Sequence, residues 1–280
     1  MSIASTNQAG SSEMNFRQQK KSGISPRQKK RDRLCLPLNL SGEGIEYGPL
    51  HQPIVTRDIS HVRYVDYADR AHLVQKYRNH VNVIEADIVD IDIVTGGERI
   101  VRFIEPDSID YIVASHVAEH VPDLISWLDD NLTILKPGGR ISLALPDKRF
   151  CFDMMRNSSS VSGLVAAWLE KRTRPDFATI CEAHFNAVHA SAKDAWAKRT
   201  TPKNATYKIE RSRIIPLLKH IQHQDTYHDV HCWVFTAQEF HQLLRDETGI
   251  RPYISTPYSI VSFEPTKKRS DEFFICLEKA

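Results

Sequence analysis

Two short segments bring together side chains that could move a proton. The first is Ser115-His116-Val117-Ala118-Glu119-His120, and the second is Tyr227-His228-Asp229-Val230-His231-Cys232-Trp233. An aspartate beside a histidine can hold the ring in one tautomer and leave its other nitrogen free to accept a proton. We therefore predict His228 and His231 as the first candidates for a general base, with His116 ranked just behind them. Glu119 and His120 are interpreted as residues that fix the local loop.

The second segment also has a metal-binding interpretation. The run His220-x-x-His223-x-x-x-x-His228-Asp229-x-His231 contains side chains that ligate divalent ions. No regular helix or strand places that spacing on one face, so we expect no metal, and hydrogen-bonded structural histidines remain an alternative for the whole run. The five cysteines are scattered and form no C-x-x-C motif, which favours neither a disulfide framework nor a thiolate site.

Acidic residues and a glycine mark the ends of three predicted strands. Glu46-Tyr47-Gly48 ends the first, Asp66 the second and Asp87 the third. In an open α/β sheet, a nucleoside binds beyond the carboxyl ends of the strands, where a glycine turn and a carboxylate meet it. Gly48 would let the backbone approach the ligand, Asp66 would accept hydrogen bonds from the ribose hydroxyls, and Asp87 would reach the adenine edge.

The elements that position these residues alternate between short apolar runs and helical patterns, which predicts an α/β fold. The strands are expected at 44–48, 62–66, 81–86, 109–115 and 140–145, with helices at 69–78 and from Pro122 through Leu135. Lys136-Pro137-Gly138-Gly139 is expected to end the second helix.

The rest of the chain divides into an insertion and a closing unit. Residues of about 148–230 are rich in His, Arg and Trp and predict helices and loops without a clear strand. Thr236-Ala237-Gln238-Glu239 is a capping box that opens a helix, followed by strands at 252–263 and 272–278. The connection between those two strands is too short for a helical crossover, so the last strand should be antiparallel to its neighbour.

These motifs together resemble the class I S-adenosylmethionine-dependent methyltransferases, especially the small-molecule and glycan group. The resemblance is carried by Glu46-Tyr47-Gly48, Asp66, Asp110-Tyr111, Ser115-His116-Val117-Ala118-Glu119-His120-Val121 and Leu135-Lys136-Pro137-Gly138-Gly139. It covers residues 43–150 and 230–280. One departure concerns the first loop, where the family usually has several glycines and this chain has Gly48 followed by Pro49-Leu50-His51-Gln52-Pro53. Cofactor contacts there should differ, with His51 replacing a backbone contact.

The resemblance implies a doubly wound, mostly parallel seven-stranded sheet with an antiparallel last strand and a helical insertion before the final helix. It implies S-adenosylmethionine as cofactor, bound near Glu46, Gly48, Asp66, Asp87, Ser115 and His116. It also implies methyl transfer, first of all to a hydroxyl of a small or sugar-like acceptor beneath a cap formed by the insertion. Methylation at nitrogen or carbon, and a non-catalytic module that keeps the cofactor or only the fold, remain alternatives.

Charge is unevenly distributed along the chain. The 280 residues carry a net charge of +2, but residues 1–34 have eight Lys or Arg residues against two acids. We therefore expect a disordered basic tail over 1–34 and one methyltransferase domain over 35–280, with no nucleic-acid partner for its mildly acidic body. There is no apolar run long enough to span a membrane and no signal-peptide pattern at the N-terminus, which together predict a cytoplasmic protein.

Overall fold

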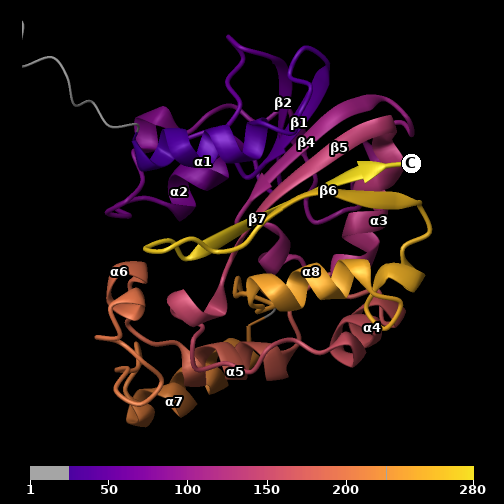
Figure 1. Ribbon diagram of the computed structural model, residues 1–280. Coiled ribbons are helices and arrows are strands. Elements are labelled where there is room, and N and C mark those ends of the chain that lie inside the picture. The colour runs from indigo at the N-terminus through magenta and orange to yellow at the C-terminus, as the bar shows by residue number, and fades with distance from the viewer. Residues whose placement is uncertain (1–24, 225) are drawn as a thin grey trace, which may run out of the picture.

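The computed structural model describes residues 25–224 and 226–280, which form a seven-stranded sheet in the order β3-β2-β1-β4-β5-β7-β6 (Figure 1). The strands are β1 (Glu43–Tyr47), β2 (His61–Asp66), β3 (Ile93–Val94), β4 (Ile109–Ser115), β5 (Leu135–Pro146), β6 (Tyr258–Glu264) and β7 (Glu272–Lys279). Strands β1 to β5 pair in parallel, and β7 is antiparallel to both β5 and β6. The predicted fold class is thus confirmed.

Helices cover both faces of this sheet (Figure 1). They are α1 (Pro26–Cys35), α2 (Arg70–Lys76), α3 (Leu124–Ile134), α4 (Val161–Leu169), α5 (Phe177–Asn186), α6 (Ala192–Trp196), α7 (Arg211–Gln222) and α8 (Ala237–Arg245). The larger apolar core joins β1, β4, β5 and β7 to α3, α4 and α8, and a second core on the other face includes Leu34 of α1. None of the described helices is long and apolar enough to cross a membrane.

The sequence interpretation of the N-terminal tail is wrong at its boundary. Residues 1–24 lie outside the described residues, but residues 26–35 form α1, which Ser25 caps and Pro26 opens. Leu34 is fully buried, and Lys30 forms a 2.8 Å ion pair with Glu272 of β7. A single buried leucine in a basic helix produces almost no apolar periodicity, so the composition looked like that of a disordered arm.

The predicted third strand is also wrong. Val81 is 94 % exposed and Ile84 is 56 % exposed, and the segment forms turns and a short 3₁₀ helix (η1, Glu85–Asp87). The third strand is instead β3, whose Ile93 pairs with Val65 of β2. The Asp92 side chain accepts a hydrogen bond from the Tyr64 amide at 2.7 Å, which extends the contact between the two strands.

The closing unit has the predicted order of one helix and two strands, but β6 begins at Tyr258 rather than at residue 252, because Arg251–Tyr253 form a short 3₁₀ helix. Thr236 and Glu239 form the predicted capping box at the start of α8. The insertion contains α4, α5, α6 and α7, and among its described residues the only bridge is the isolated pair Val188 and Tyr207. Strand β5 begins at Leu135, directly after α3, so the Lys136–Gly139 motif belongs to the strand rather than to a separate loop.

Candidate active site

The carboxyl ends of β1, β2 and β4 meet at one edge of the sheet. Tyr47, the last residue of β1, pairs with Val65 on one side and with Ala114 on the other. Gly48, Asp66 and Ser115 therefore follow or end three adjacent strands. The strand order reverses between β1 and β4, which is where open α/β sheets bind their ligands.

The loop after β1 is organised by Glu46. Its carboxylate is 2 % exposed and accepts hydrogen bonds from the amides of Ile54 at 2.7 Å and Val55 at 2.8 Å. Burial raises the pKa of Glu46 to about 7, although these backbone hydrogen bonds lower it. Glu46 thus holds the loop in place with both of its oxygens.

Two left-handed residues turn the chain in the same loop. Gly48 has φ +60° and donates its amide to Val65 at 2.9 Å, while Leu50 adopts φ +45°. A Cβ atom at Gly48 would lie 3.2 Å from Val117. The turn that a glycine-rich loop makes with several glycines is made here by Gly48 and Leu50.

Asp66 lies where the sequence predicted it, and Asp87 does not. Asp66 ends β2, and Oδ1 accepts from the amides of Tyr67 at 2.7 Å and Ala68 at 3.4 Å, so its hydrogen bonds with described residues leave Oδ2 unused. Burial raises the pKa of Asp66. Asp87 lies in η1, whereas β3 ends at Val94, so Asp87 does not end the third strand.

The exit of the insertion is bound to the loop that follows β4. That loop forms a 3₁₀ turn, η3 (Ala118–His120). The amides of Cys232 and Trp233 both donate to the Glu119 carbonyl, at 2.7 and 3.1 Å, and the Trp233 indole donates to Val121 at 2.7 Å. These three hydrogen bonds bring His231, from the far end of the insertion, next to Glu119 and His120.

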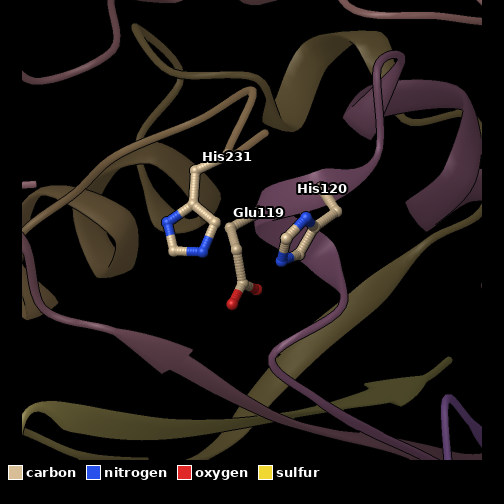
Figure 2. Close-up of side chains that lie close together, drawn as sticks. All are labelled: Glu119, His120 and His231. Atoms are coloured by element: carbon tan, nitrogen blue, oxygen red, sulfur yellow. The ribbon is translucent and has the colours of Figure 1, made fainter. Parts of the chain in front are cut away.

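Glu119, His120 and His231 form one compact cluster (Figure 2). One ligand atom from each side chain lies within 4.8 Å of the other two. His120 Nδ1 lies 2.8 Å from Asp229 Oδ1, and His231 Nδ1 lies 2.6 Å from Asp153 Oδ2. Figure 2 shows the Glu119 carboxylate between the two rings, with a nitrogen of each ring turned toward it.

His116 lies beside this cluster with φ +55°, directly after β4. Its Nε2 lies 2.9 Å from Glu272, and its Nδ1 lies 3.4 Å from Glu119. Burial disfavours the charged imidazole, but the two carboxylates outweigh it and raise the pKa of His116 to about 9. A histidine that is already protonated near neutral pH is a poor proton acceptor.

The structure places the other two base candidates, His228 and His231, in different surroundings. His228 Nε2 lies 2.8 Å from His184 Nε2 of α5, so His228 is bound within the insertion. Asp229, which the sequence placed beside His228 and His231, instead contacts His120 and Lys76. Only His231 lies in the cluster, and its carboxylate partner is Asp153.

Sequence reasoning missed the roles of Glu119, His120 and Asp153. The signal for Glu119 and His120 was present, since they directly follow a buried strand that ends at the binding edge. Asp153 carried no such signal, because 78 residues separate it from His231.

The comparison with protein families decides the identity. A family described as "Methyltransferase domain" matches residues 28–250. The chain belongs to this methyltransferase family. With the strand order and the antiparallel β7, this makes it a class I S-adenosylmethionine-dependent methyltransferase, as the sequence motifs predicted. No curated protein sequence matches the chain.

The chain is similar to several solved structures of methyltransferases. One is an S-adenosylmethionine-dependent methyltransferase from Mesorhizobium loti, with 13 % identity, a TM-score of 0.42, and coverage of 88 % of this chain and 95 % of that one. Another is the CurJ carbon methyltransferase, with 10 % identity, a TM-score of 0.39, and coverage of 86 % and 49 % respectively. The DszA carbon methyltransferase has 11 % identity, a TM-score of 0.37, and coverage of 86 % and 48 %. The methyltransferase chain spans about half the length of CurJ and DszA.

The residues at the edge of the sheet fit S-adenosylmethionine, the methyl donor of the family. Gly48 turns the backbone with a positive φ, and Asp66 keeps Oδ2 unused beside it. His51 Nδ1 is buried in the adjacent loop and has no hydrogen-bond partner among residues 25–224 and 226–280. Gly48 and Asp66 would hold the ribose end, and the bound donor would supply a methyl group already activated on a sulfonium.

Proposed function

We propose that this methyltransferase transfers the methyl group to a hydroxyl of a small or sugar-like acceptor, and that Glu119, His120 and His231 promote the loss of the hydroxyl proton. In the overall reaction, the bond between methyl and sulfur breaks while a bond to the acceptor oxygen forms. The hydroxyl proton is released, so the products are S-adenosylhomocysteine, a methyl ether and a proton.

The observation that carries this proposal is the attachment of the insertion to the binding edge. The hydrogen bonds from Cys232 and Trp233 to Glu119 hold the end of the insertion against the loop after β4. An acceptor held between the insertion and the edge of the sheet would meet the cluster on the side opposite the donor. That is the side from which a nucleophile must approach, because the methyl group is transferred in line.

Three arginines of the insertion are already paired with carboxylates. Arg149 pairs with Asp147, Arg156 with Asp153 and Glu182, and Arg172 with Glu170 and Asp176. Guanidinium groups that already bind carboxylates are less available for a phosphate.

The test is a screen of hydroxyl acceptors, including monosaccharides and nucleotide sugars, with methyl-labelled S-adenosylmethionine. Once an acceptor is found, His231→Ala should lower kcat by roughly 10²–10⁴ and leave the Kd of the cofactor unchanged. His228→Ala should lower kcat by less than about tenfold. Equal losses in the two variants, or normal turnover by His231→Ala, would contradict the assignment of the cluster.

The control for the kcat measurements is His72→Ala. His72 is an exposed histidine of α2 whose Nδ1 lies 2.8 Å from Asp69, so it matches the aspartate pairing of His231 but lies outside the cluster. If the protein binds S-adenosylmethionine and transfers its methyl group only to nitrogen or carbon acceptors, the hydroxyl proposal fails. Binding without transfer to any acceptor would favour the non-catalytic module.

A further inference from the structure

We propose that Glu119, His120 and His231 form a binding site for one divalent transition-metal ion, such as zinc. The sequence analysis expected no metal, but it considered only the run of histidines between His220 and His231. The structure brings together two histidines and a glutamate from both sides of the insertion.

The donor set and its spacing suit such an ion. Two imidazoles and one carboxylate are a ligand set of zinc and of iron(II), whereas magnesium and calcium prefer oxygen ligands alone. Ligands at about 2.0–2.2 Å from an ion are roughly 2.8–3.6 Å apart in tetrahedral or octahedral geometry. The three atoms lie within 4.8 Å of one another, so small side-chain rotations would close the site.

Carboxylates on the far side of both rings prepare the histidines as ligands. Asp229 accepts from His120 Nδ1 at 2.8 Å and Asp153 from His231 Nδ1 at 2.6 Å, which leaves the Nε2 atom of each ring without a hydrogen bond to the described residues. Metal-ligating histidines usually donate their other nitrogen in this way, and the contact orients the ring and strengthens it as a ligand. Asp153 is itself held by Arg156 at 3.2 Å, and Asp229 by Lys76 at 3.1 Å. Each histidine thus belongs to an ordered chain of contacts.

The Glu119 carboxylate supplies an independent indication of a missing partner. Its side chain is 1 % exposed, and neither oxygen has a hydrogen-bond partner within the described part of the chain. Its nearest compensation is the 3.4 Å contact with His116. The His116 contact is long and reaches one oxygen only, so both oxygens of this buried carboxylate could still bind a dication.

The ion would keep open coordination positions on the side of His120, whose side chain is 33 % exposed, while those of Glu119 and His231 are buried. Three protein ligands with an open position are typical of catalytic zinc sites.

For the acceptor chemistry, this inference rests on the proposed function. A hydroxyl bound at the open position would become more acidic and release its proton to solvent, so His231 would act as a ligand rather than as a base.

Cobalt(II) is the probe for this site, because it takes the place of zinc and its visible absorption reports the ligand geometry. The full chain, freed of metal by a chelator, should bind one equivalent of cobalt(II) with new absorption bands, and zinc(II) should displace it. Magnesium at the same concentration should not bind. Absence of stoichiometric cobalt and zinc binding to the folded chain would overturn the proposal and identify the cluster as a proton-bound network of carboxylates and histidines.

Variants then assign the ligands. Glu119→Gln and His120→Ala should each weaken metal affinity by more than about 100-fold, and Asp153→Asn should weaken it by about 10–100-fold through His231. His72→Ala should bind as the unchanged chain does. Circular dichroism checks the fold of each variant. If a variant does not fold, the cobalt(II) absorption spectrum of the unchanged chain still decides the proposal. Full affinity in the folded Glu119→Gln and His120→Ala variants would show that the ion binds elsewhere. Metal binding without hydroxyl methylation would refute only the proposed function.

Discussion

His231 Nδ1 lies 2.6 Å from Asp153 Oδ2, although the two residues are 78 positions apart in the chain. Both side chains are buried, and the same carboxylate contacts the buried Arg156 guanidinium at 3.2 Å. The pair joins the beginning of the insertion to its end. A single carboxylate therefore orients a histidine of the candidate site and neutralises a buried cation.

Asp153→Asn should lower the free energy of unfolding by about 2–4 kcal/mol, because it removes the charge that compensates the buried Arg156 guanidinium and weakens the contact with His231 Nδ1. Urea denaturation measures this change. Glu182→Gln is the matched control, since Glu182 also pairs with Arg156 but its side chain is 35 % exposed. If the two variants lose the same free energy of unfolding, the buried Asp153 carboxylate contributes no more to stability than the partly exposed Glu182 carboxylate.

Asp66→Ala should weaken S-adenosylmethionine binding by roughly 10–100-fold, because the ribose hydroxyls would lose the Asp66 Oδ2 acceptor. Titration calorimetry on the folded variant measures the Kd. Asp87→Ala is the control, because η1 places Asp87 away from the end of a strand. A large effect of Asp87→Ala with none of Asp66→Ala would reverse the assignment.

Leu34→Ala should destabilise the protein by about 2–4 kcal/mol, because Leu34 is fully buried in the second core. Leu36→Ala, two residues later at 84 % exposure, should change the stability by less than about 0.5 kcal/mol. Thermal and urea denaturation compare the two. Equal stabilities would mean that α1 does not contribute to the folded core.

The pH dependence of stability should include a contribution from Glu46. Burial raises the pKa of Glu46 from its ordinary 4.5 to about 7, so between these values the folded chain binds more protons than the unfolded chain. Stability should therefore fall as pH rises from 4.5 through 7, by up to about 3 kcal/mol from this group.

Glu46→Gln provides the comparison, since it cannot titrate. Its free energy of unfolding, measured by urea at pH 5 and pH 8, should fall less with rising pH than that of the unchanged chain. The variant should also be less stable at pH 5, because an amide nitrogen cannot accept the hydrogen bond from Ile54 or Val55. Identical pH dependence in the two proteins would show that Glu46 is ionised at low pH in the fold.

Local patterns in the sequence were sufficient for most of the sheet. The apolar run 109–115 became β4, and the capping box at Thr236 opened α8, because burial on both faces and helix capping depend on neighbouring residues. Local sequence patterns did not predict β3 or α1. A strand of two residues and a helix with one buried leucine leave no periodicity to detect.

The sequence by itself determined the methyltransferase fold and placed Gly48, Asp66, Ser115 and His116 at the ends of adjacent strands, since parallel strands present their carboxyl ends at one edge. Only the tertiary structure decided which histidine joins that edge. The amides of Cys232 and Trp233 bind Glu119 and bring His231 to His120, while His228 turns to His184. Such pairings depend on how the insertion packs against the sheet, and no spacing along the chain encodes them.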